Sequence, residues 1–221
     1  MTTSLVALAV VMAVVIGWLV RQTIGTMPWV EQRPVANDTS GAGLALPSIK
    51  IGLGVFMTVA TSLFALSISA YLMRREGADW RPLAQPMVLW LNTAMLVLGS
   101  VFFQWANNAA RSGNAGGLKN GLLAGGACTF AFLAGQLLAW QQLGDAGYYV
   151  QSNPANAFFY FLTALHGLHL LGGLWVWGTT IVRVQRGSAV RDVRMSVELC
   201  TAYWHFLLVI WLILFGLLLF T

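Results

Sequence analysis

The sequence predicts an all-α fold, a polytopic membrane helix bundle with about six transmembrane helices. Of the 221 residues, 58% are hydrophobic and 9% are charged, and the mean hydropathy is +0.73. A soluble domain contains about 25% charged residues, so this composition excludes an ordinary water-soluble globule. A membrane-spanning helix needs about 20 mainly apolar residues, and several apolar runs in this chain approach or exceed that length.

The first apolar run, residues 4–20, is predicted to be a retained transmembrane helix. No basic residue precedes it, which argues against a cleaved signal peptide. The segment that follows is polar and rich in proline and turn-forming residues, so it is predicted to be a loop. We therefore expect residues 1–48 to form an extra N-terminal transmembrane helix with a polar loop, and residues 49–221 to form a five-helix membrane domain. Its spans are expected at 49–73, 87–109, 121–140, 157–181 and 197–220.

The basic residues are divided unequally between the two sides of the membrane. Cytoplasmic loops of membrane proteins are enriched in Lys and Arg, so the richer side is predicted to be cytoplasmic and both termini to lie outside. The net charge of +5 follows from this loop bias and does not indicate a nucleic-acid partner. The cytoplasmic set is Arg21, Arg33, Lys50, Arg111, Lys119, Arg183, Arg186, Arg191 and Arg194, and the outer set is Arg74, Arg75 and Arg81.

All three histidines lie in the last two predicted spans. His166 and His169 are three residues apart, so they share one face of a helix. Ionisable residues at membrane depth are costly and usually have a reason to be there. We favour histidines that are hydrogen-bonded in the bundle interior, and the alternative is ligation of a metal or haem. A catalytic zinc site needs three protein ligands and a di-iron site needs several carboxylates, whereas Glu198 is the only acid within a predicted span.

Glu198 stands two helical turns before His205 on the same face of the last span. It is either an interfacial carboxylate that reaches cytoplasmic water or a buried member of a polar cluster with the histidines. We expect the cluster, without catalytic, metal or cofactor ligands, to comprise His166, His169, Glu198, His205, Trp204 and Gln136.

Other polar and small residues in the spans are assigned to helix packing. Asn92, Thr93 and Gln136 are expected to form hydrogen bonds between helices, and Gly121 with Gly125 forms a small-xxx-small pattern that permits close approach. Two cysteines in apolar runs are interpreted as buried small hydrophobes. Interface anchoring and packing, rather than a cofactor site, are expected for Trp140, Trp175, Trp177 and Trp204.

The last two spans carry two motifs in a fixed order. The first is residues 159–169, FYFLTALHGLH, with Gly173 four residues later. The second is Glu198, six residues and then His205, with Trp211 following. Together they resemble the signature of subunit III of the haem–copper terminal oxidases, and the resemblance covers about residues 50–220. Supporting similarity lies in residues 136–143, QLLAWQQL, and in Gly52, Gly54, Phe56, Phe64 and Tyr71 of the first shared helix.

The resemblance implies a helical membrane subunit that lies beside the catalytic subunit I in the bacterial inner (plasma) membrane. Such a subunit carries no haem or copper, which are expected in partner subunits. It stabilises subunit I during turnover and holds phospholipids in a cleft between its helix groups. The family is also associated with proton delivery and oxygen access. The electron donor, cytochrome c or quinol, binds to other subunits of these oxidases.

Three positions depart from the pattern of this family. Ala60 stands where the family usually has an intramembrane glutamate, Ala139 where it often has an acid, and Leu208 where it typically has an aspartate. The extra N-terminal helix is also absent from the minimal five-helix form. These departures indicate a divergent branch, so a role of the missing carboxylates in proton uptake is not carried over.

The function expected from the sequence is a non-catalytic subunit III of a respiratory terminal oxidase, which performs aerobic electron transport and O₂ reduction. One alternative is a subunit III-like accessory protein of a nitric oxide reductase, which co-purifying partners would distinguish. Another is a free-standing membrane haem or metal protein using the three histidines, which optical spectra would distinguish. A transporter would be indicated by broken helices and inverted repeats, and the sequence has neither sign.

Overall fold

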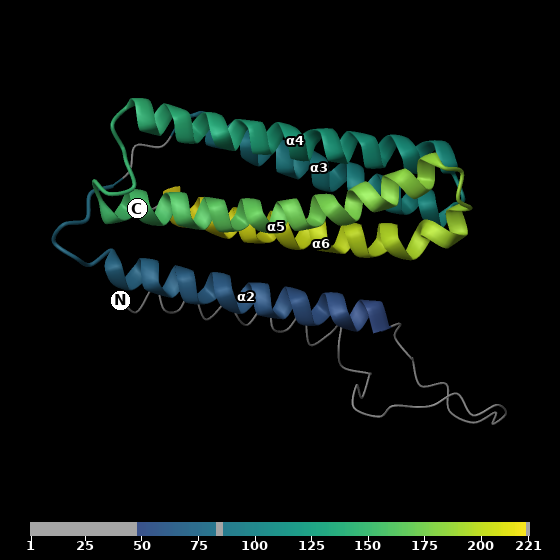
Figure 1. The fold of residues 1–221 in the computed structure, drawn as a ribbon, viewed down its shortest axis with the longest axis horizontal. Helices are drawn as coiled ribbons and strands as arrows, with labels where there is room; N and C mark the ends of the chain where they lie inside the picture. Colours follow the sequence, from purple (N-terminus) through teal and green to yellow (C-terminus); the bar gives the residue numbers. More distant parts are fainter. Residues whose placement is uncertain (1–47, 83–85, 220–221) are drawn as a thin grey trace, which may run out of the picture. The chain divides into compact units, whose positions relative to one another are not determined.

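The computed structural model describes residues 48–82 and 86–219, and its regular structure is α-helical (Figure 1). Each of its five helices is long and apolar enough to cross a membrane, which confirms an all-α, multi-helix membrane fold. The predicted first span at 4–20 and most of the loop after it lie outside the described residues. The helices are α2 Ser48–Arg74, α3 Val88–Arg111, α4 Ala115–Asp145, α5 Pro154–Gln185 and α6 Val190–Leu219.

The chain divides into two compact units, residues 1–63 and 64–221. The described part of the first unit is the N-terminal portion of α2, which contains Ala60. Its hydroxyl groups bond to carbonyls one turn earlier, as Thr61 Oγ1 does to the Met57 carbonyl at 2.8 Å. Thr58 and Ser62 do the same, at 2.9 and 3.0 Å. These bonds satisfy side chains that would otherwise be costly on a membrane helix.

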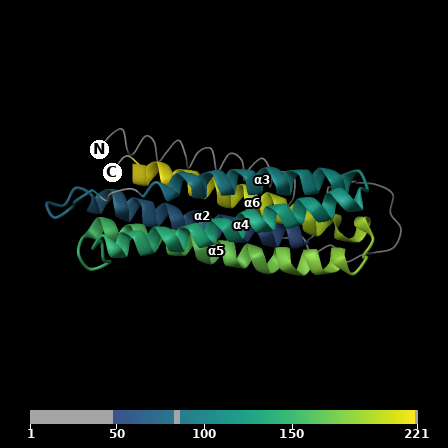
Figure 2. The same ribbon diagram turned by 90° about the horizontal axis from the view of Figure 1, so that it is seen from above.

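The second unit is built around an antiparallel bundle of α3, α4, α5 and α6 (Figure 2). Helix α3 packs against α4 and α6, and α5 packs against the same two helices. The contact between α3 and α4 is close because glycines of α4 face α3. An ideal Cβ placed on Gly121 would lie 2.9 Å from the Ala106 backbone nitrogen, and one on Gly125 would lie 2.9 Å from the Phe103 ring. The predicted small-xxx-small pattern therefore lies at this helix contact.

Asparagine side chains begin two of the helices. Asn114 Oδ1 accepts a hydrogen bond from the Gly117 backbone N–H at 2.9 Å at the start of α4. Asn153 caps α5 in the same way through Ala155, and Pro154 occupies the first turn, where a missing N–H costs nothing. Both helices consequently start several residues before the apolar runs from which they were predicted.

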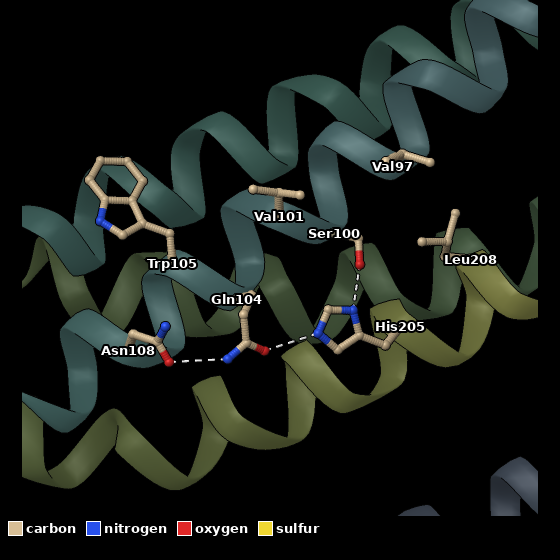
Figure 3. A pocket seen from close by; sticks show the side chains of 8 residues that line it. All are labelled: Val97, Ser100, Val101, Gln104, Trp105, Asn108, His205 and Leu208. Carbon is tan, nitrogen blue, oxygen red and sulfur yellow. Dashed lines mark hydrogen bonds between the residues drawn. The ribbon is translucent and has the colours of Figure 1, made fainter.

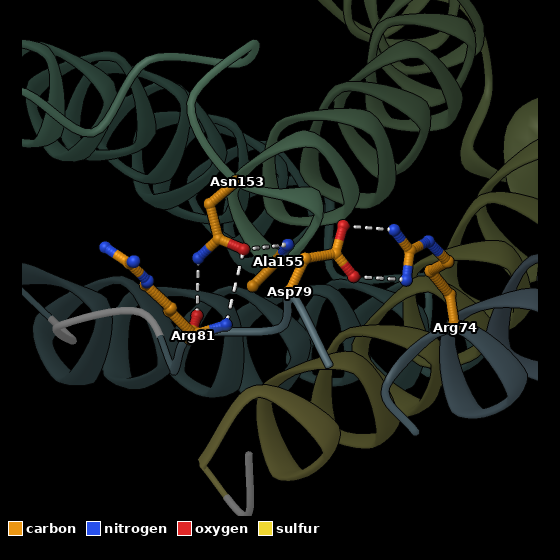
Figure 4. Close-up of polar contacts among 5 residues, drawn as sticks. All are labelled: Arg74, Asp79, Arg81, Asn153 and Ala155. Carbon is orange, nitrogen blue, oxygen red and sulfur yellow. Dashed lines mark hydrogen bonds and ion pairs between the residues drawn. The ribbon is translucent and has the colours of Figure 1, made fainter. Parts of the chain in front are cut away.

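The loop between α2 and α3 is held at one end of the second unit by polar contacts (Figure 4). Asn153 Nδ2 donates to the Arg81 carbonyl at 2.5 Å, and its Oδ1 accepts from the Arg81 N–H at 3.4 Å. Arg74 Nη1 donates to Asp79 Oδ1 at 2.8 Å. The Arg74 guanidinium holds the pKa of the Asp79 carboxyl below its usual range. Both groups are exposed, so this ion pair orders the loop and adds little stability.

Candidate functional site

Helix α6 hydrogen-bonds to each of the other helices of the bundle through side chains in its middle part. Most of these side chains are aromatic, so each one fills space between helices and also satisfies a polar atom. The bonds are Thr201 Oγ1 to the Phe103 carbonyl (3.1 Å) and Trp211 Nε1 to Thr93 Oγ1 (3.0 Å) on α3, Trp204 Nε1 to Thr129 Oγ1 (2.9 Å) on α4, and Tyr203 Oη to the His169 carbonyl (3.0 Å) on α5.

His205 lies half-buried between α6 and α3 (Figure 3). Its Nδ1 hydrogen-bonds to Ser100 Oγ, and its Nε2 lies 3.0 Å from Gln104 Oε1. Gln104 Nε2 in turn donates to Asn108 Oδ1 at 3.1 Å. Gln104 Oε1 can only accept, so the ring carries a proton on Nε2, whereas the Ser100 hydroxyl is able either to donate to Nδ1 or to accept from it. Both ring nitrogens of His205 are thus engaged in hydrogen bonds.

His166 is fully buried between α5 and α6. Its Nε2 donates to the Leu207 carbonyl at 3.1 Å. Its ring lies 5.7 Å from the Phe132 ring and 5.2 Å from the Trp211 ring, measured between centroids. The Nδ1 atom is buried and has no hydrogen-bond partner in the described part of the chain. This environment favours a neutral histidine that serves helix packing.

His169 lies one turn from His166 and is less buried. Its Nδ1 donates to the Leu165 carbonyl of its own helix at 2.8 Å. Its ring lies 5.2 Å from the Phe64 ring. The two histidines of α5 therefore have different surroundings although three residues separate them.

The remaining predicted cluster residues lie on α4 and α6. Gln136 on α4 is 5% exposed, and its Oε1 accepts from Asn92 Nδ2 of α3 at 3.5 Å. Glu198 is half-buried near the start of α6. Trp204 is buried, with its ring centroid 4.7 Å from that of Phe103. These side chains therefore take part in several contacts along the bundle.

The residues of the predicted polar cluster thus lie at different contacts between helices. His166, His205, Trp204 and Gln136 each hydrogen-bond to a residue outside the predicted set. His166 bonds to α6, whereas His205 bonds to α3. Ala60, at the position of the expected glutamate, lies in α2 within the unit of residues 1–63.

Two further tryptophans donate hydrogen bonds within the bundle, and a third is exposed. Trp140 Nε1 donates to Thr163 Oγ1 at 3.1 Å, and Trp177 Nε1 donates to the Leu122 carbonyl at 2.8 Å. Trp175 is 78% exposed on α5. A membrane-facing Trp175 is the arrangement expected of an interface anchor.

Three residues in the hydrogen-bonded series that includes His205 were not singled out from the sequence. Ser100, Gln104 and Asn108 recur at every fourth position of an otherwise apolar span. Residues spaced by four lie along one face of a helix, so this spacing was the available signal. Over residues 48–82 and 86–219, no group of three or more His, Cys, Asp or Glu side chains could hold a metal ion.

Comparison with known proteins places this chain in a family. The family model for cytochrome c oxidase subunit III matches residues 3–220. The chain belongs to the cytochrome c oxidase subunit III family. The cytochrome c oxidase subunit 3 of Thermostichus vulcanus is 30% identical over 173 residues, which covers 76% of this chain and 85% of the relative. The cytochrome c oxidase subunit 3 of Synechocystis sp. is 30% identical over 170 residues, which covers 74% of this chain and 72% of the relative. A probable cytochrome c oxidase subunit 3 of Nocardia farcinica is 27% identical over 173 residues, which covers 76% of this chain and 85% of the relative.

Membership of the subunit III family defines the chain's general role. It is a multi-pass membrane protein and a non-catalytic, accessory subunit of a respiratory haem–copper oxidase. The redox cofactors of the oxidase belong to other subunits, with which a subunit III associates.

Proposed function

We propose that this subunit III stabilises the catalytic subunit I of its oxidase during turnover and retains phospholipid beside it. The observation that carries the proposal is the division between the inside and the outside of the bundle. Most of its buried polar side chains bond between or within its own helices, while large apolar side chains such as Leu168, Leu171 and Trp175 are exposed. Such a surface fits a neighbouring membrane helix or lipid, because neither supplies water to polar groups.

The proposal predicts how the oxidase behaves without this subunit. Initial oxygen consumption and the haem spectrum should be near normal, because no redox ligand is lost. Activity should then decay faster with the number of turnovers, because packing and retained lipid no longer resist local opening of subunit I. Oxygen consumption and optical spectra of the purified enzyme, followed over successive turnovers, measure both quantities.

Replacing Glu198 with alanine should cause a milder decay, since this change leaves the helix bundle in place. An enzyme restored with the unaltered subunit is the control. Immediate loss of the haem spectrum on deletion would indicate an assembly role. A lower but time-stable rate would indicate a direct role in proton or oxygen delivery. Either result contradicts the proposal.

We further propose that the protein lies in the bacterial inner (plasma) membrane with both termini on the outer side. This orientation puts the end of α5, the start of α6 and the loop between them, with the four arginines of 183–194, in the cytoplasm. A reporter that is active only outside the cytoplasm should give a signal when fused after Thr221. The same reporter within 183–194 should be silent, and the reverse pattern would contradict the orientation.

A further inference from the structure

A groove of about 430 Å³ opens between α3 and α6 on the surface of the second unit (Figure 3). Its lining surface is mainly apolar, with a small polar part. No acidic side chain lines it. The lining residues are Val97, Ser100, Val101, Gln104, Trp105, Asn108, His205 and Leu208.

The polar part of the groove contains a continuous series of hydrogen bonds. The Ser100 hydroxyl bonds to His205 Nδ1, His205 Nε2 donates to Gln104 Oε1, and Gln104 Nε2 donates to Asn108 Oδ1. The exposed end of this series is the Asn108 amide nitrogen, which is a donor. Neither it nor Trp105 Nε1 has an acceptor in the described part of the chain. The groove thus presents N–H donors without acceptors.

The donors Asn108 Nδ2 and Trp105 Nε1 lie near the C-terminal end of α3 and therefore near the edge of the hydrocarbon layer. Arg111, the last residue of α3, follows Asn108 by three residues, about 4.5 Å along the axis, on the same exposed face. No acidic partner of Arg111 lies among residues 48–82 and 86–219. Tryptophan and arginine are typical of the depth at which acyl chains meet headgroups.

We propose that this groove binds one phospholipid, with its phosphate at Trp105, Asn108 and Arg111 and an acyl chain against Val97, Val101 and Leu208. The assignment rests on the proposed lipid-retaining function and gives it a site. A phosphate diester can only accept hydrogen bonds and is negatively charged, which complements the exposed donors and the arginine. Acyl chains complement the apolar part.

The chain's own N-terminal apolar run fits the groove less well. Within the run of residues 4–20, only Ser4 at its start has a side-chain oxygen, so the side chains of such a helix would leave most donors of the groove without acceptors. A helix of another subunit would need an acceptor side chain at the depth of Asn108. A phospholipid carries acceptor oxygens on its phosphate, and that phosphate lies at the depth of Asn108.

The test uses the intact oxidase in nanodiscs of phosphatidylcholine and phosphatidylglycerol. A trace of the phosphatidylglycerol carries a photoactivatable diazirine in one acyl chain and serves as the probe. After irradiation, mass spectrometry should locate label on the segments 97–101 and 205–208. The double variant Trp105→Phe with Asn108→Leu removes the donors but keeps apolar bulk. It should lower this labelling about tenfold, which corresponds to about 1.4 kcal/mol. Trp175→Phe, on the exposed face of α5, is the matched control and should leave it unchanged.

Several outcomes would overturn the lipid site. The first is a groove that stays unlabelled while other surfaces are labelled. The second is labelling of the groove that the double variant does not reduce. The third is protein cross-linking that finds residues 1–47 or another subunit in the groove. The proposed function is tested separately by the lipid retained per oxidase with and without this subunit. Normal retention with an unlabelled groove contradicts only the site, whereas equal retention with and without the subunit contradicts the lipid-retaining function itself.

Discussion

Replacing Trp204 with alanine is expected to lower the free energy of unfolding of this subunit by about 3–5 kcal/mol. The side chain is 2% exposed and lies where α6 meets three other helices. Its ring is 4.7 Å from that of Phe103 on α3, and its Nε1 donates to Thr129 Oγ1 of α4 at 2.9 Å. On α5, an ideal Cβ placed on Gly173 would lie 2.5 Å from the Trp204 ring. Alanine would leave a large cavity among all four helices.

Two comparison variants separate the cavity from the hydrogen bond. Trp204→Phe keeps most of the volume and should cost about 1–2 kcal/mol, because Thr129 Oγ1 still bonds to the Gly125 carbonyl at 3.0 Å. Trp175→Ala removes a 78% exposed ring and should change stability by less than about 0.5 kcal/mol. Titration of the subunit from mild detergent into sodium dodecyl sulfate, followed by circular dichroism, gives the differences. Equal costs for Trp204→Ala and Trp175→Ala would contradict this packing.

The helices of the described region follow from hydropathy because the bilayer imposes a minimum apolar length on every span. Their ends were less predictable. The fourth span was expected at 121–140, but α4 runs from Ala115 to Asp145. A helix continues beyond the apolar layer as long as backbone hydrogen bonding and a cap allow it, and Asn114 supplies that cap.

The partners of the histidines could not be obtained from hydropathy. A span's apolar length sets its depth, but it does not determine which face turns toward which neighbour. His205 and Glu198 were grouped with the α5 histidines because they occupy neighbouring spans in the sequence. In the structure His205 bonds to Ser100, a residue 105 positions earlier, because α3 also packs against α6. The regular spacing of Ser100, Gln104 and Asn108 carried this information only in combination with the arrangement of the helices.

Replacing Gly121 with alanine is expected to destabilise the subunit by about 1–3 kcal/mol, although alanine favours helices more than glycine does. The added Cβ would lie 2.8 Å from the Ala106 Cβ and 2.9 Å from its backbone Cα and N atoms. A backbone cannot rotate away as a flexible side chain can, so α3 and α4 must move apart along their contact. Valine at this position should have a larger effect and leave the purified oxidase depleted of the subunit.

The matched control for Gly121→Ala is Gly216→Ala on α6, where no heavy atom lies within 4 Å of the added Cβ. There the helix propensity of alanine acts alone, and stability should rise by up to about 1 kcal/mol. The two glycine-to-alanine substitutions should therefore change the free energy of unfolding in opposite directions in the same detergent titration. A stabilising Gly121→Ala would show that α3 and α4 do not approach as closely as their glycines permit. Under the proposed function, an oxidase depleted of the subunit by Gly121→Val should also lose activity with turnover as the deletion does, since both changes remove this subunit from the enzyme.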